Sequence, residues 1–189
     1  SYVDMISELR SGLPHLRHVV CCGGEGDLSE DVLRFEDVME SGGSGLADIA
    51  SVDPDDTKVV LYTSGTTGNP KAVRHSHNTL AKALDNGVIA WGLDDRDMML
   101  MPSPVTHVTG YVNGIELPFF TDTKVLLMES WVVSRAVELI ETHHATTCVS
   151  ATPFLRELVD ACRKQGKDLP SFRLFACGGA AVPSALIYE

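Results

Sequence analysis

The stretch LYTSGTTGNPKAVRHSH (61–77) combines hydroxyl side chains, glycines and a single lysine, Lys71, within a short run. An apolar run, TKVVLYT (57–63), leads into it and predicts a buried strand, and KAVRHS (71–76) predicts a second strand directly after it. Glycines let backbone N–H groups approach a ligand, hydroxyls add donors, and lysine supplies a mobile positive charge. We therefore interpret the stretch as a loop between two strands that wraps a polyphosphate.

The loop does not fit the Walker A pattern, GxxxxGK[ST]. Counted from Gly65, the second required glycine falls on Pro70, and Ala72 follows Lys71 where Ser or Thr is required. A Walker A loop also leads into a helix whose N-terminus holds the phosphate, whereas a strand pattern follows here. On composition alone, an ordinary glycine- and threonine-rich hairpin remains the alternative.

Apolar runs and helical patterns alternate along the rest of the chain. We expect strands at 16–22, 97–103, 124–129, 146–151 and 172–179, and helices at 31–40, 77–92, 109–120, 134–144, 152–166 and after 182. Thr152 is expected to cap the 152–166 helix, and the run Met98–Met101 is expected in a strand core. The alternation after residue 97 predicts an α/β fold with a largely parallel sheet flanked by helices, in which ligands lie beyond the carboxyl ends of the strands.

Composition restricts the class of protein. The chain has 189 residues, enough for about one domain, with 44% hydrophobic residues and a net charge of −11 that disfavours nucleic acid and anionic membranes. It has no secretory signal and no membrane-spanning apolar run. The five cysteines form no CxxC pair, which favours reduced thiols in a cytoplasmic protein. His75 and His77 are expected to share a strand face, but no histidine spacing matches a metal motif.

Three loops that follow predicted strands carry distinctive residues: YTSGTTGNPKAV (62–73), PSPVTHVTG (102–110) and ACGGAAVP (176–183). In this order they resemble the signature segments of the adenylate-forming superfamily, which includes acyl-CoA synthetases, luciferases and non-ribosomal adenylation domains. The segments THVTGYVNGIELPF, SATPFLRELVDA and LFACGGAAVP are most similar to short- and medium-chain fatty acyl-CoA synthetases and cyclohexanecarboxylate-type CoA ligases.

The resemblance implies a reaction in two steps. A carboxylic acid attacks Mg-ATP to give an acyl-adenylate, and coenzyme A then takes the acyl group. Residues 1–189 would be part of the N-terminal, nucleotide- and acyl-binding domain, without the C-terminal domain, and inactive alone. Two alternatives stay open: a stand-alone nucleotide-binding or interaction module without catalysis, and an amino-acid adenylation domain.

The resemblance also assigns residues to roles. The expected nucleotide-binding residues are Thr63, Ser64, Gly65, Thr66, Thr67, Gly68, Lys71, Gly178, Gly179 and Ala180, with Thr67 the candidate to approach magnesium. The expected acid-binding residues are His107, Thr109, Gly110 and Ser150. Lys71 and His107 are the expected catalytic residues, and His107 is expected to position the acid rather than to transfer a proton.

Overall fold

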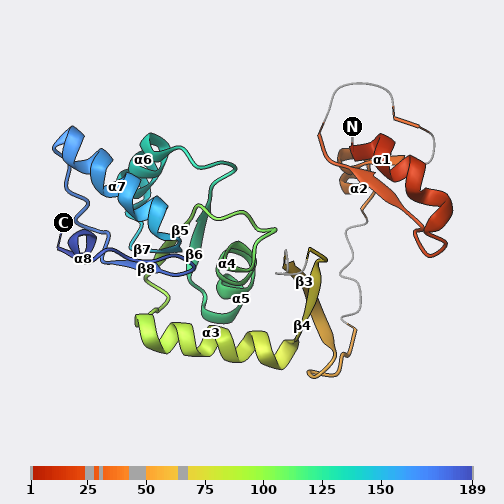
Figure 1. Cartoon of the computed structure of the whole chain (residues 1–189), viewed down its shortest axis with the longest axis horizontal. Helices are drawn as coiled ribbons and strands as arrows, with labels where there is room; N and C mark the ends of the chain where they lie inside the picture. Colours follow the sequence, from red (N-terminus) through yellow and green to blue (C-terminus); the bar gives the residue numbers. More distant parts are fainter. Residues whose placement is uncertain (1, 24–27, 30–31, 43–49, 64–67, 189) are drawn as a thin grey trace. The chain divides into compact units, whose positions relative to one another are not determined.

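The computed structural model describes residues 2–23, 28–29, 32–42, 50–63 and 68–188. The chain divides into two compact units, Ser1–Ser51 and Val52–Glu189, coloured red to orange and orange to blue in Figure 1. The predicted functional segments all fall in the second unit.

The first unit pairs two short parallel strands. Its elements are α1 (Tyr2–Leu9), a 3₁₀ turn η1 (Arg10–Gly12), β1 (Val19–Cys21), β2 (Val32–Arg34) and α2 (Phe35–Ser41). The expected helix over 31–40 was wrong at its start, because Val32–Arg34 forms β2 and pairs with β1, with Val32 opposite Val19. Pairing with a strand distant in sequence overrides the local helical pattern there.

The second unit begins with a hairpin of two antiparallel strands, β3 (Thr57–Thr63) and β4 (Lys71–Ser76). The two predicted strands are therefore confirmed. The expectation that the first is buried was wrong: Tyr62 is 72% exposed and Val60 41%. Among the described residues the hairpin pairs only with itself, so its two outer edges carry no neighbouring strand.

Helix α3 (His77–Trp91) follows the hairpin without a linker. The side chain of Ser76 caps it by accepting the N–H of Thr79, and Gly92 ends it in the left-handed region with φ 59°. The predicted helix is confirmed. His77 is its first residue, so the expectation that His75 and His77 share a strand face was wrong.

The centre of the unit is a four-stranded parallel sheet in the order β6-β5-β7-β8. Its strands are β5 (Met98–Met101), β6 (Lys124–Leu127), β7 (Thr147–Ser150) and β8 (Leu174–Cys177). Met99, Leu100 and Met101 in β5 are fully buried, which confirms the predicted strand core and the predicted parallel sheet.

Helices cover both faces of this sheet (Figure 1). The remaining elements are α4 (Val108–Gly110), a π-helix η2 (Tyr111–Glu116), α5 (Leu117–Thr121), α6 (Val133–His143), α7 (Thr152–Gln165) and α8 (Ser184–Ile187). Leu100 packs in one cluster with α6 and α7, while Met99 and Met101 pack in a second with α3 and α5. The alternation of side chains along β5 thus divides the core into two layers.

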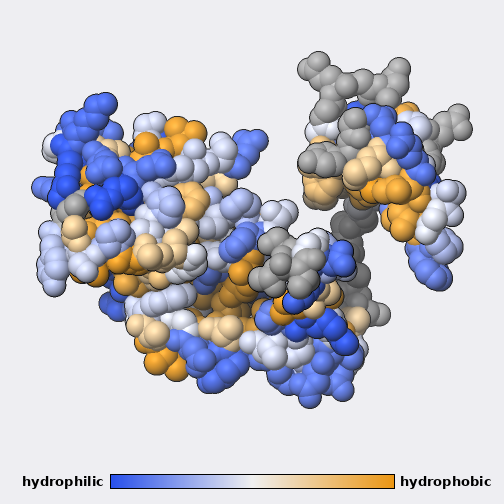
Figure 2. Space-filling view, in the orientation of Figure 1, coloured by the Kyte–Doolittle hydropathy of each residue, from blue (hydrophilic) through white to orange (hydrophobic). Residues whose placement is uncertain are grey.

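Two helix details differ from expectation. The single helix expected over 109–120 is interrupted by the π-helix η2. Thr152 was wrongly expected as an N-cap: Ala151 occupies that position without a side-chain bond, and the Thr152 hydroxyl instead donates to the carbonyl of Ala180 at 3.5 Å. Hydrophilic residues gather on the surface of α7, over its carboxyl-terminal half (Figure 2).

Candidate functional site

The hairpin tip brings together the two ends of the predicted phosphate loop. Thr63 and Lys71 are paired across the hairpin, and the Thr63 hydroxyl donates to the Lys71 carbonyl at 3.5 Å. Both residues are exposed, as is Gly68, which has φ 87° and no atom near the position of a Cβ. Ser64, Gly65, Thr66 and Thr67 lie outside the described residues, and so does the predicted approach of Thr67 to magnesium.

His107 lies at the end of a tight turn that follows β5. Its N–H donates to the carbonyl of Pro104 at 3.0 Å, and its Nδ1 accepts the N–H of Thr109 at 3.2 Å as the cap of α4. An accepting Nδ1 places the ring proton on Nε2, which makes that nitrogen a donor. The side chain is exposed, so it can donate to a carboxylate oxygen. This geometry supports a positioning role.

Gly110 holds this turn against the helix. A Cβ at residue 110 would lie 2.1 Å from the Pro104 carbonyl oxygen and 2.6 Å from the Ser103 carbonyl oxygen. Only glycine permits this approach without moving the backbone. Gly110 is buried, so the described contacts give it a packing role beneath His107.

A cavity of about 270 Å³ joins the hairpin to the His107 turn. Its lining consists of Leu61, Tyr62, Thr63, Val73, His75, Thr106, His107 and Val108. Two predicted residues, Thr63 and His107, therefore face one space. Thr106 and Val108 were missed, although their position on either side of His107 in the quoted motif could have identified them. Thr109, Gly110 and Ser150 do not line this cavity.

Ser150, the last residue of β7, connects two of the three predicted loops, those that follow β5 and β8. Its Oγ lies 2.9 Å from the Oγ of Ser103 after β5, and its carbonyl accepts the N–H of Gly178 after β8 at 3.1 Å. Ser150 is 3% exposed, so it holds the loops together from below. Ser103 was missed, although a polar residue in a turn at a strand end is a recognisable signal.

The glycine turn after β8 presents open backbone. No atom lies within 4 Å of the Cβ positions of Gly178 and Gly179, and Gly179 adopts φ 75°. Both glycines and Ala180 are exposed. A flat ligand can therefore lie against this turn, as the sequence predicts.

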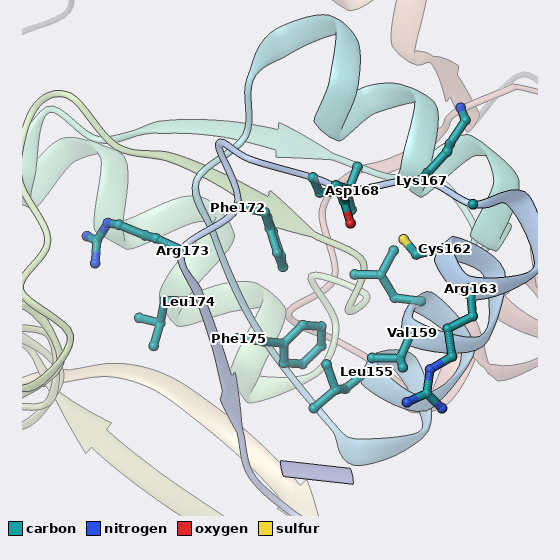
Figure 3. Close-up of a pocket in the computed structure, with 13 residues that line it drawn as sticks. Leu155, Val159, Cys162, Arg163, Lys167, Asp168, Phe172, Arg173, Leu174 and Phe175 are labelled. Carbon is teal, nitrogen blue, oxygen red and sulfur yellow. The ribbon is translucent and has the colours of Figure 1, made fainter. Parts of the chain in front are cut away.

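A larger cavity, about 560 Å³, lies between α7 and β8 (Figure 3). Phe172 and Phe175 form apolar walls, while the charged ends of Arg163 and Lys167 point away from the centre. None of the predicted site residues lines it. The chemistry of the lining, rather than size, identifies the smaller cavity as the candidate site.

Burial disfavours the thiolate form of the cysteines of the second unit. Burial raises the pKa of Cys148, Cys162 and Cys177, so these thiols stay protonated at neutral pH. Within the described ranges, no three His, Cys, Asp or Glu side chains converge in a way that could hold a metal ion. No helix in that part of the chain combines the length and apolar character needed to cross a membrane.

Comparison with known proteins identifies the family. The AMP-binding enzyme family matches residues 3–189, which is nearly the whole chain. The chain belongs to the AMP-binding enzyme family. The predicted superfamily and its α/β fold are thereby confirmed.

Relatives within the AMP-binding family are CoA ligases. The chain is 28% identical over 187 residues to the medium-chain fatty-acid–CoA ligase of Escherichia coli (strain K12), covering 99% of this chain and 33% of that protein. It is 32% identical over 172 residues to the long-chain fatty-acid–CoA ligase FadD13 of Mycobacterium tuberculosis (strain ATCC 25618 / H37Rv), covering 83% and 31%. The chain thus spans about a third of the length of the curated relatives it matches.

Among solved structures of the family, the anthranilate CoA ligase AuaEII in complex with anthranoyl-AMP superposes with a TM-score of 0.83 and 26% identity. The match covers 99% of this chain and 36% of that one. The arrangement of hairpin, helices and sheet described above is therefore the arrangement of an adenylate-forming enzyme.

Proposed function

We propose that residues 1–189 form the phosphate-loop part of the N-terminal domain of an AMP-forming carboxylic acid–CoA ligase. The substrate class is a fatty or alicyclic acid, as in the relatives named fatty-acid–CoA ligases. The observation that carries the proposal is the shared cavity: Thr63 from the phosphate hairpin and His107 from the acyl loop line one space. A ligase of this kind must bring a triphosphate and a carboxylate together in such a space.

The first step forms the acyl-adenylate. A carboxylate oxygen attacks the α-phosphorus of ATP, an acyl–O–P bond forms, and the bond to pyrophosphate breaks. Negative charge grows on the departing pyrophosphate, and donors fixed around it stabilise that charge. Thr63, Gly68 and Lys71, together with the 64–67 segment, would supply these donors. Mg²⁺ enters with ATP as part of the substrate, with Thr67 the candidate hydroxyl to meet it.

His107 would hold the acid for this attack. The Nε2–H that its capping geometry leaves as donor would bind one carboxylate oxygen, while the other oxygen faces the phosphorus. Alignment of two bound reactants contributes strongly to rate, because the reacting atoms must meet at a defined distance and angle. The open backbone of Gly178, Gly179 and Ala180 would carry the adenine and the acyl group.

The second step transfers the acyl group. The thiol of coenzyme A attacks the acyl carbon, the acyl–oxygen bond breaks, and AMP leaves with that oxygen. The free thiols agree with a reducing, cytoplasmic compartment for this reaction.

The test uses both the product of the complete open reading frame that encodes the chain and residues 1–189 alone. Each is incubated with Mg-ATP, coenzyme A and a panel of straight-chain acids, cyclohexanecarboxylic acid and amino acids. We expect AMP, pyrophosphate and acyl-CoA from the complete protein only, and only with a fatty or alicyclic acid. Formation of ADP and phosphate, or turnover with amino acids alone, would overturn the proposal.

A further inference from the structure

A short polar chain connects the base of the hairpin to the helical segment beneath His107. The Nζ of Lys58 in β3 lies 2.5 Å from Oε2 of Glu116, the last residue of η2. The hydroxyl of Tyr111, the first residue of η2, donates to Oε1 of Glu116 at 2.6 Å. The side chains of Lys58 and Glu116 are only 28% and 16% exposed. Glu116 is thus the better shielded of the two partners, while Lys58 stays in contact with solvent.

The helical side of this contact depends on the π-helix. A π-helix closes its hydrogen bonds between residues five apart, so Tyr111 and Glu116 lie one turn apart on nearly the same face. In an α-helix, with 3.6 residues per turn, residue 116 would point well away from residue 111. The π-helix therefore allows one carboxylate to accept from Tyr111 and from β3 together.

The strand side of the contact is irregular too. Thr57 pairs with Ser76, but Val59 pairs with His75, so β3 contains one extra residue, Lys58, at a bulge. A bulge redirects the side chain of the extra residue. Two departures from regular geometry, one in each element, thus meet at the same ion pair.

The elements joined by this ion pair also form the two walls of the candidate site. Lys58 lies near the start of β3 and Thr63 is its last residue. Helices η2 and α4 follow one another directly and lead back from Glu116 to His107, which caps α4. Lys58 and Glu116 connect the two elements at one end. Thr63 and His107 face the same cavity at the other end.

The charges in this network persist at neutral pH. Burial alone would raise the pKa of Glu116, but the hydrogen bonds from Lys58 and Tyr111, with the nearby charges of Lys58 and His77, lower it overall. The hydrogen bond to Glu116, with burial, raises the pKa of Tyr111 to about 12. Glu116 is thus ionised and Tyr111 is a neutral donor.

We propose that Glu116 is a positioning residue that, through Lys58 and Tyr111, sets the separation of the phosphate hairpin from the His107 turn. The proposal rests on the proposed function, since the two walls it aligns are those that would hold ATP and the acid. Glu116 does not line the cavity that Thr63 and His107 share. Its contacts with Lys58 and Tyr111 would hold the start of β3 against the end of η2.

The kinetic test uses the complete protein with Glu116→Gln, Lys58→Met, the two combined, and Lys58→Arg. Lys82→Met is the matched control, because Lys82 pairs with Asp85 at an exposed position of α3. We expect each of the first two variants to lower kcat for adenylation about tenfold, because misaligned reactants still bind but react slowly. The KM values should change less than about twofold. The double variant should lower kcat little further than either single variant, because both act on one contact. Lys58→Arg, which keeps the positive charge, should retain the wild-type kcat. A Lys58→Met rate equal to that of Lys82→Met, or a rise in KM without loss of kcat, would overturn the proposal.

A second readout needs no catalysis. In the complete protein, methyl NMR signals of Val73 and Val108 report from opposite walls of the cavity. We expect both to shift in Lys58→Met and Glu116→Gln and neither in Lys82→Met; unmoved signals would overturn the proposal. If the unchanged complete protein shows no acid-dependent use of ATP, the proposed function fails, and these signals alone decide whether Glu116 fixes the cavity.

Discussion

The β3–β4 hairpin and the four-stranded sheet both consist of apolar strands, yet they are stabilised in different ways. Leu100 at the centre of the sheet is fully buried against α6 and α7, whereas Val60 in the hairpin is 41% exposed. The sheet therefore gains its stability from apolar burial, and the hairpin depends on a few polar contacts. Among the described residues, the hairpin is therefore the less buried of the two regions.

The polar contacts of the two regions differ in the same way. At the amino-terminal end of the sheet, the carboxylate of Asp97 accepts from Arg173 at 2.6 and 3.1 Å and from Thr146 at 2.6 Å. These bonds join the starts of β5, β7 and β8 and stabilise the sheet. Lys58 and Glu116 instead connect η2 to the hairpin.

The largest expected effect is a loss of stability when apolar burial is removed from the four-stranded sheet. Leu100→Ala removes a fully buried side chain from the central strand and should lower the free energy of unfolding by about 3–5 kcal/mol. Val60→Ala in the hairpin should cost less than about 1 kcal/mol. Denaturant unfolding of both variants measures the contrast. Equal losses would show that the hairpin is as tightly packed as the sheet.

The next effect concerns the turn under His107. Gly110→Ala places a methyl group against the Pro104 carbonyl and should cost about 2–3 kcal/mol, because backbone must move. Gly178→Ala, where nothing lies near the Cβ, is the matched control. NMR shifts of the His107 ring should change only in the first variant. An undisturbed ring in Gly110→Ala would contradict the close approach.

A smaller effect is expected at the base of the sheet. Burial would raise the pKa of Asp97, but hydrogen bonds from Arg173, Thr146 and the Asp94 N–H lower it overall. Asp97→Asn should cost about 2 kcal/mol at neutral pH, since Arg173 is half-exposed and regains water. The lowered pKa stabilises the fold above the ordinary carboxyl pKa of about 4, and this stabilisation is lost as the pH falls through the native value.

The pH dependence of unfolding checks this assignment. The difference in free energy of unfolding between wild type and Asp97→Asn should become smaller below about pH 4. Asp85→Asn, which breaks an exposed pair, serves as control and should cost under about 0.5 kcal/mol. A difference independent of pH would mean that the charge of Asp97 does not stabilise the fold.

The smallest effect is at the link to the hairpin. Tyr111→Phe removes one hydrogen bond to Glu116 and should cost about 1 kcal/mol, while Tyr62→Phe, at an exposed position, should be neutral. Phenolate absorbance should show a tyrosine that ionises near pH 12 in the wild type and not in Tyr111→Phe. If Tyr111→Phe still shows an ionisation near pH 12, the raised pKa belongs to another tyrosine.

The sequence predicted features that depend on local pattern. Alternating apolar runs predicted the parallel sheet, and Pro70 and Ala72 predicted a loop between strands rather than a Walker A loop. The order of three motifs predicted the family. His107 could be placed near a ligand because loops at the carboxyl ends of parallel strands gather on one edge of a sheet. Thr63 lies in a separate hairpin, and only the family resemblance predicted it in the same site.

Features that depend on distant pairing could not be predicted. Val32–Arg34 forms a strand only because β1 lies beside it. The Lys58–Glu116 contact spans 58 residues and requires a bulge and a π-helix, neither of which has a periodic signature. The exposure of Val60 and Tyr62 in the hairpin depends on which other elements pack on its faces, and the apolar run itself does not reveal that.

Oxygen transfer tests the central claim most directly. The complete protein is given a fatty acid labelled with ¹⁸O in its carboxylate, with Mg-ATP and coenzyme A, and the AMP is analysed by mass spectrometry. If the carboxylate attacks the α-phosphorus of ATP in the candidate site, one labelled oxygen must appear in AMP as the thioester forms. AMP without label, or release of ADP, would contradict the account.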